Sequence, residues 1–152
     1  AVANLVWPGT RVLSVCIGFF STRLSEMASR AGGEVEKLQV EDGSSACPDA
    51  IEAILKRFNP QVLTIVQGET SNTTHNHDLP QIAQLAKQYD CLIVVDAVCT
   101  LSTMPLKMDE WGIDAVITGG QKGLSSIPGV SLVAFSDQAW QRVLSRSEPM
   151  RH

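Results

Sequence analysis

The stretches LIVVDAVCT (residues 92–100) and DAVITGGQKGLSS (residues 114–126) decide the fold of this chain. Each contains a short apolar run rich in β-branched residues, which is typical of a strand buried on both faces in a parallel sheet. The first run ends in the carboxylate of Asp96, and the second ends in glycines followed by the amine of Lys122. Because open α/β sheets bind ligands at the carboxyl ends of their strands, the two runs predict a ligand site with an acid and an amine.

On either side of these runs, strand patterns alternate with helix patterns. Further strands are predicted at residues 11–17, 34–40, 61–66 and 129–135. Residues 1–7 are predicted to be the last turns of a helix, and further helices are predicted at residues 19–33, 48–58, 79–90 and 136–146, with a short helical turn near KMDEWG. Ser21 or Thr22 is the expected N-cap of the helix at 19–33, and Ser136 is the expected N-cap of the last helix.

This alternation predicts an α/β fold, a three-layer sandwich whose sheet is mostly parallel. The connection between Lys122 and the strand at 129–135 is too short for a parallel crossover. The last strand is therefore expected to run antiparallel to its neighbour.

The composition narrows the class of protein. The 152 residues suffice for one domain with a core, and 44% apolar with 18% charged residues is ordinary for a globular protein. A net charge of -4 with scattered basic residues indicates neither a nucleic-acid nor a membrane partner. The cysteines show no paired spacing, so we expect them to be reduced, as in a cytoplasmic protein. They are Cys16, Cys47, Cys91 and Cys99.

The sequence lacks the motifs of several common metal-binding, nucleotide-binding and hydrolase sites. His75 and His77 form an HxH in a polar loop without a third histidine, so no metal site is expected. The chain has no GxxxxGKS/T, no GxGxxG after a strand and no GxSxG. A P-loop, a dinucleotide site and a hydrolase elbow are therefore not predicted.

Asp96 and Lys122 each have an ordinary structural explanation. An aspartate at a strand end often caps the next turn, and a lysine in a loop is often only solvated. Together they match what pyridoxal phosphate requires, namely an acid that keeps the ring nitrogen protonated and an amine that forms a Schiff base. Thr70 and Ser71 of QGETS offer hydroxyl donors, although such pairs more often form turns.

Residues 94–136, VVDAVCTLSTMPLKMDEWGIDAVITGGQKGLSSIPGVSLVAFS, resemble the core of the class V aminotransferases of pyridoxal-phosphate fold type I. Within this family the chain most resembles the alanine/serine–glyoxylate aminotransferases, and the resemblance covers nearly the whole chain. It implies that Lys122 is the Schiff-base lysine and proton shuttle and that Asp96 pairs with the pyridinium nitrogen. It further implies that Val98 packs on one face of the ring and that Phe20 stacks on the other.

The same resemblance assigns roles to two more residues. Thr70 matches the hydroxyl near the phenolic oxygen of the cofactor, and Gln121 matches a residue that contacts the phosphate. One departure concerns Gln67, which stands where many relatives have a histidine in an HGE motif. Glutamine does not titrate, so any acid–base role of that histidine is lost.

The resemblance also implies an organisation and an activity. Residues 1–152 correspond to part of the pyridoxal-phosphate-binding large domain, with an N-terminal segment and a C-terminal small domain outside the sequence. The expected activity of the full-length homodimer is ping-pong transfer of an amino group from a small amino acid of the alanine or serine type to a 2-oxo acid such as glyoxylate. The fragment alone is expected to be weak or inactive.

Two alternatives stay open. A cysteine desulfurase shares the cofactor class, but such enzymes usually carry histidine where Gln121 precedes the lysine. A non-catalytic remnant or an interaction module would keep the fold without the chemistry.

Overall fold

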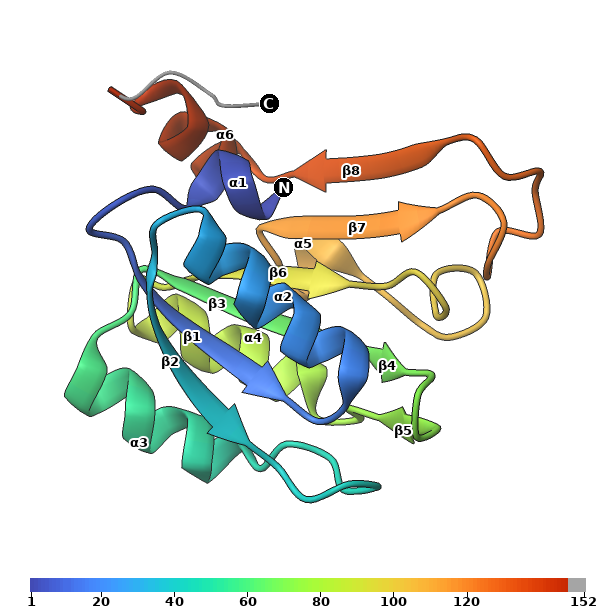
Figure 1. Cartoon of the computed structure of the whole chain (residues 1–152), viewed down its shortest axis with the longest axis horizontal. Helices are drawn as coiled ribbons and strands as arrows, with labels where there is room; N and C mark the ends of the chain where they lie inside the picture. Colours follow the sequence, from blue (N-terminus) through green and yellow to red (C-terminus); the bar gives the residue numbers. More distant parts are fainter. Residues whose placement is uncertain (148–152) are drawn as a thin grey trace.

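Six strands build one central sheet in the computed structural model, which describes residues 1–147 (Figure 1). The strand order is β2-β1-β3-β6-β7-β8. In chain order the strands are β1 (Arg11–Cys16), β2 (Glu34–Gln39), β3 (Val62–Val66), β6 (Leu92–Asp96), β7 (Ala115–Gly119) and β8 (Ser131–Phe135). The first five pair in parallel, and β8 runs antiparallel to β7. The predicted mostly parallel sheet with an antiparallel last strand is thus confirmed.

Helices cover both faces of this sheet (Figure 1). They are α1 (Val2–Leu5), α2 (Phe19–Arg30), α3 (Pro48–Phe58), α4 (Leu79–Gln88), α5 (Met108–Trp111) and α6 (Asp137–Leu144). On one side α1 contacts both α2 and α6, and on the other α4 contacts both α3 and α5. This is the three-layer arrangement that the alternating pattern predicts. Among residues 1–147, no helix combines the length and apolar composition needed to cross a bilayer.

The core lies along the central strands. Every residue of β3 is buried, as are four of the five residues of β6, with Asp96 the partly buried last one. Burial on both faces accounts for the apolar runs without alternation. The register sets Asp96 beside Val66, the last residue of β3, and beside Ile117 of β7, so the carboxylate lies at the carboxyl ends of β3 and β6.

The start of α2 differs from the prediction. The helix begins at Phe19 and its N-cap is Gly18, so the expectation that Ser21 or Thr22 caps it is wrong. The Ser21 hydroxyl instead accepts from the backbone N–H groups of Ile17 and Gly18, at 2.9 and 3.0 Å. The prediction for Ser136 is confirmed, because its hydroxyl accepts from the N–H of Ala139 at 3.1 Å.

A small antiparallel hairpin follows β3, where the sequence predicts only a polar loop. It pairs β4 (Gly68–Glu69) with β5 (Thr74–His75). Strands of two residues are too short to show a hydrophobic period, which is why the pattern does not reveal them. The hairpin projects from the carboxyl end of the sheet next to α2 (Figure 1).

Candidate active site

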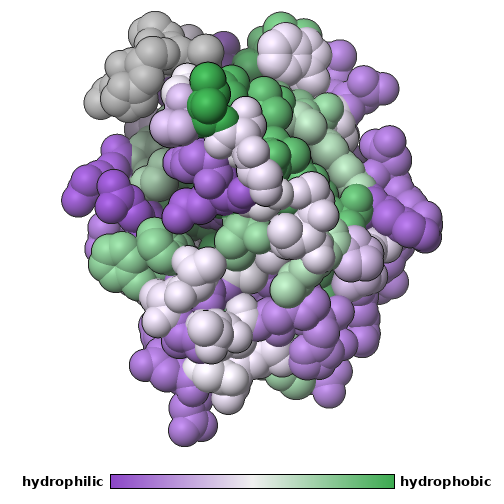
Figure 2. Space-filling view, turned by 90° about the vertical axis from the view of Figure 1, so that its right-hand side faces the viewer, coloured by the Kyte–Doolittle hydropathy of each residue, from purple (hydrophilic) through white to green (hydrophobic). Residues whose placement is uncertain are grey.

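A cavity of about 350 Å³ opens at the carboxyl end of the sheet. Four segments line it: the start of α2, the β4 hairpin, the end of β6 and the turn after β7. Five of the six predicted site residues lie on its wall, namely Phe20, Thr70, Asp96, Val98 and Lys122. Figure 2 views the molecule from this end and shows hydrophilic groups near the middle, between apolar ones. Segments far apart in the sequence thus form one site.

Asp96 supplies the acid of this cavity. Its carboxylate Oδ1 accepts from the backbone N–H of Val98 at 2.9 Å. Burial raises the pKa of Asp96, the Val98 N–H acts in the opposite direction, and the negative charge of Glu69 raises the pKa further. A desolvated carboxylate beside a second acid is stabilised by a cationic ligand.

Lys122 supplies the amine, from the turn that follows β7. The backbone N–H of Gly123 donates to the Val98 carbonyl, which ties this turn to the segment after Asp96. A Cβ at Gly123 would lie 2.2 Å from the Leu101 carbonyl oxygen, so only glycine allows the two segments to approach this closely. The Lys122 side chain is exposed on the cavity wall.

An aromatic ring and a hydroxyl complete the wall. Phe20 is 43% exposed although it is a large apolar residue, and its ring meets that of Phe19 edge-to-face at 5.2 Å. Thr70 is exposed directly after β4. Phe20 therefore presents a ring face or edge to a ligand that would cover it.

Gln121 lies differently from the other predicted residues. It is exposed and is not among the residues that line the cavity, and its side chain folds back toward Gly119. Gln67, at the position of the family histidine, is buried, and its Nε2 donates to the Pro105 carbonyl at 2.9 Å. Gln67 thus supports the connector after β6 rather than reaching into the cavity.

Sequence reasoning missed Glu69, which lies behind the cavity wall. This carboxylate is only 1% exposed, yet it accepts hydrogen bonds from Phe20, Ser21 and Ser71. The available signal was an acidic residue between small residues, in QGETS, directly after a buried strand. Cys99, Arg23 and Met27 also line the cavity and were not predicted.

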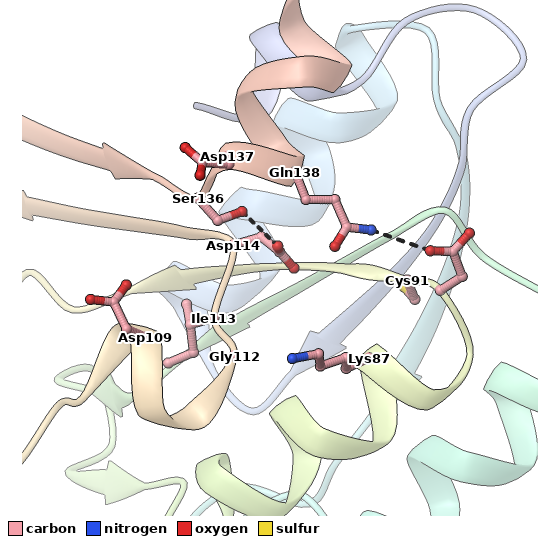
Figure 3. Close-up of a pocket in the computed structure, with 10 residues that line it drawn as sticks. Lys87, Cys91, Asp109, Gly112, Ile113, Asp114, Ser136, Asp137 and Gln138 are labelled. Atoms are coloured by element: carbon pink, nitrogen blue, oxygen red, sulfur yellow. Dashed lines mark hydrogen bonds between the residues drawn. The ribbon is translucent and has the colours of Figure 1, made fainter.

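A second cavity, of about 490 Å³, lies at the opposite end of the sheet and contains none of the predicted residues. In Figure 3 the hydroxyl of Ser136 points at the carboxylate of Asp114, and the two are 2.8 Å apart. The other oxygen of Asp114 accepts from the N–H of Ile93 at 2.9 Å. Asp114 therefore joins β6, β7 and the start of α6, and its hydrogen bonds are structural.

Comparisons with known proteins point to one family. The family model "Aminotransferase class-V" matches residues 2–149. The chain is 34% identical over 146 residues to an alanine–glyoxylate aminotransferase of Oryctolagus cuniculus, which covers 96% of this chain and 37% of that protein. It is also 34% identical over 150 residues to an (S)-ureidoglycine–glyoxylate transaminase of Bacillus subtilis, covering 99% of this chain and 36% of that protein.

A solved structure agrees with these relatives. The ureidoglycine–glyoxylate aminotransferase structure from Bacillus subtilis matches with a TM-score of 0.95 at 33% identity, covering 99% of this chain and 39% of that one. The present chain thus spans little more than a third of the length of the relatives it matches.

Proposed function

Because this chain belongs to the class-V aminotransferase family, whose members depend on pyridoxal phosphate, we propose that the intact protein is a pyridoxal-phosphate-dependent transaminase. The observation that carries the proposal is the cavity at the carboxyl end of the sheet, which is lined by both Asp96 and Lys122. A small amino acid of the alanine or serine type is the proposed donor, and a 2-oxo acid such as glyoxylate is the proposed acceptor. The glyoxylate transaminases among the relatives support this choice of substrates.

The residues of the cavity fit the chemistry of pyridoxal phosphate. Burial, and in addition the negative charge of Glu69, raises the pKa of Asp96. A protonated pyridine nitrogen beside Asp96 would stabilise the charged carboxylate and so counteract this effect. Phe20 offers an aromatic surface and Val98 an aliphatic one on the wall of the same cavity. A cavity of about 350 Å³ is within the size range of cofactor sites.

When bound, the cofactor supplies an electron sink for the carbanion formed at the substrate Cα. In the proposed mechanism Asp96 would hold a proton on the ring nitrogen, which would keep that sink effective. Lys122 would hold the cofactor covalently and would move the proton at the substrate Cα. Thr70 would donate to the phenolic oxygen. Gln121, whose side chain folds back toward Gly119 outside the cavity, would have to turn toward the cavity to contact the phosphate. The proposed order is ping-pong, in which the product of the donor leaves before the acceptor binds.

The proposal extends to the assembly. Residues 1–152 are proposed to be part of the cofactor-binding large domain, since the chain spans 37% of the length of its relative from Oryctolagus cuniculus. A homodimer is proposed for the intact protein because the resemblance to the family implies one. A cytoplasmic location is proposed because the four cysteines are free in the structure, as is usual in reducing compartments.

The test is to mix the intact protein with pyridoxal phosphate and record the visible spectrum, then to reduce with borohydride and map the modified peptide. A modified Lys122, together with amino transfer from alanine or serine to glyoxylate, is the expected result. An absorbance band that is unchanged in Lys122→Ala contradicts the site assignment.

The same preparation separates the alternatives. Release of sulfide from cysteine without amino transfer would identify a cysteine desulfurase, against which the presence of Gln121 before the lysine argues. Absence of any cofactor band would identify a non-catalytic remnant.

A further inference from the structure

The buried carboxylate of Glu69 is not used by the mechanism above, although it lies directly behind the cavity wall. It is the last residue of β4 and 1% exposed. Burying a carboxylate is costly unless hydrogen bonds replace its water shell. The positions of its partners therefore show what this carboxylate holds together.

Those partners are concentrated at the start of α2. Glu69 Oε1 accepts from the backbone N–H of Phe20 at 3.2 Å, and Oε2 accepts from the backbone N–H of Ser21 at 2.9 Å and from its hydroxyl at 3.0 Å. The first N–H groups of a helix have no partner inside the helix, and an anion is favourable there. Gly18, the N-cap of α2, has no side chain that could accept hydrogen bonds from these N–H groups, and the Glu69 carboxylate accepts them instead.

Ser71 extends the network on the side of the hairpin. Its backbone N–H and hydroxyl donate to Glu69 Oε1, at 3.3 and 2.7 Å, and its hydroxyl accepts from the N–H of Phe19 at 3.0 Å. Asn72 adds a bond from Nδ2 to the Ile17 carbonyl at 2.6 Å. The chain segment before α2 and the hairpin are therefore joined at several points.

The segment before α2 and the β4 hairpin also pack closely against each other. A Cβ at Gly18 would lie 2.5 Å from Glu69 Cγ and 2.7 Å from Ser71 Oγ. Any larger residue at position 18 would thus push the helix start away from the hairpin.

We propose that Glu69 is a positioning residue that fastens the start of α2 to the β4 hairpin and so holds the Phe20 ring at the cofactor cavity. Phe20 is bonded to Glu69 through its own backbone N–H, and Thr70, which also lines the cavity, lies between Glu69 and Ser71 in the chain. The inference rests on the proposed function, because it concerns the residues that face the cofactor.

The test is a double-mutant cycle in the intact protein, with the affinity for pyridoxal phosphate as the readout. Glu69→Gln places an amide N–H₂ among backbone donors, and we expect it to weaken cofactor binding roughly tenfold. In a Phe20→Leu background the same change is expected to weaken binding less than about twofold, because no ring remains to be positioned. Glu26→Gln, an exposed glutamate on the same helix, is the control and should leave the affinity unchanged.

A second variant and a second readout keep the test decisive if Glu69→Gln folds poorly. Ser71→Ala removes the 2.7 Å bond from an exposed position and is expected to weaken binding roughly threefold. In both variants the amides of Phe20 and Ser21 should exchange with solvent faster than in Glu26→Gln. An equal loss of affinity in both Phe20 backgrounds, or unchanged affinity in Glu69→Gln and Ser71→Ala, overturns this inference alone. A wild-type protein that binds no pyridoxal phosphate overturns the proposed function as well.

Discussion

The carboxylate of Asp96 accepts a hydrogen bond from the backbone N–H of Val98 at 2.9 Å. The acid proposed to face the cofactor nitrogen is therefore held by the residue proposed to pack on the cofactor ring. This local bond is an aspartate turn at the end of a buried strand, which is the ordinary structural explanation for such a residue. The turn and the proposed contact with the cofactor can both involve this side chain. One carboxylate oxygen accepts the hydrogen bond of the turn, and Asp96 still lines the cavity.

Asp96→Asn separates these two roles. The amide oxygen can still accept from Val98, so the turn should persist, whereas the negative charge opposite the ring nitrogen is lost. We expect transaminase activity to fall about 100-fold. The melting temperature should stay the same or rise, because burial raises the pKa of Asp96 and the charged form is therefore disfavoured in the fold. A large loss of stability without loss of activity would contradict the assignment.

Gly123→Ala tests how the Lys122 turn is placed. The new Cβ would lie 2.2 Å from the Leu101 carbonyl oxygen, so the turn has to move away from the segment after Asp96. We expect a loss of about 1–3 kcal/mol in the free energy of unfolding and at least a tenfold loss of activity. Gly43→Ala is the control, because its new Cβ would meet no atom within 4 Å, and its cost comes only from a positive φ of 82° that Gly123 does not share. That control should lose about 1 kcal/mol and keep its activity.

Most of the fold follows from the sequence because the strands β3, β6 and β7 are buried on both faces and their apolar runs are continuous. The same runs place Asp96 and Lys122 at one edge, since parallel strands end together. The role of Glu69 does not follow, because its partners Phe20 and Ser21 come from a distant segment and only the folded chain brings them together. The cap of α2 was mispredicted for the same reason: the Ser21 hydroxyl bonds to Ile17 and Gly18, while Glu69 takes the helix N–H groups.

Glu69 and Asp96 should give opposite pH dependences of stability. Burial tends to raise the pKa of Glu69, but hydrogen bonds from Ser71, Ser21 and Phe20 outweigh it and lower the pKa. A lowered folded pKa means that the stabilisation is complete above the unfolded value of about 4.3 and is lost as the pH falls through the folded pKa. For Asp96, whose pKa is raised, the contribution is complete below the unfolded value of about 3.9 and is lost as the pH rises through the folded pKa.

The measurement is urea unfolding between pH 3 and 7 for the wild type, Glu69→Gln and Asp96→Asn. The stability difference between wild type and Glu69→Gln should shrink toward pH 3, whereas wild type should gain relative to Asp96→Asn over the same range. Parallel curves for all three proteins would show that neither carboxylate titrates differently in the fold.

Asp114 allows stability and function to be separated at the far end of the sheet. Asp114→Ala leaves the buried N–H of Ile93 and the hydroxyl of Ser136 without the carboxylate that accepts their hydrogen bonds (Figure 3). An unsatisfied buried donor costs about 1–3 kcal/mol, so the free energy of unfolding should fall by roughly 2–4 kcal/mol for the pair. Asp114→Asn keeps an acceptor oxygen for one of these donors and should lose less stability.

The affinity of both variants for pyridoxal phosphate should equal that of wild type at temperatures where they are folded. The reason is that Asp114 lies at the amino ends of the strands that carry Asp96 and Lys122 at their carboxyl ends. A variant that is folded and stable yet fails to bind the cofactor would contradict this expectation. It would show that Asp114 contributes to cofactor binding from the other end of the sheet.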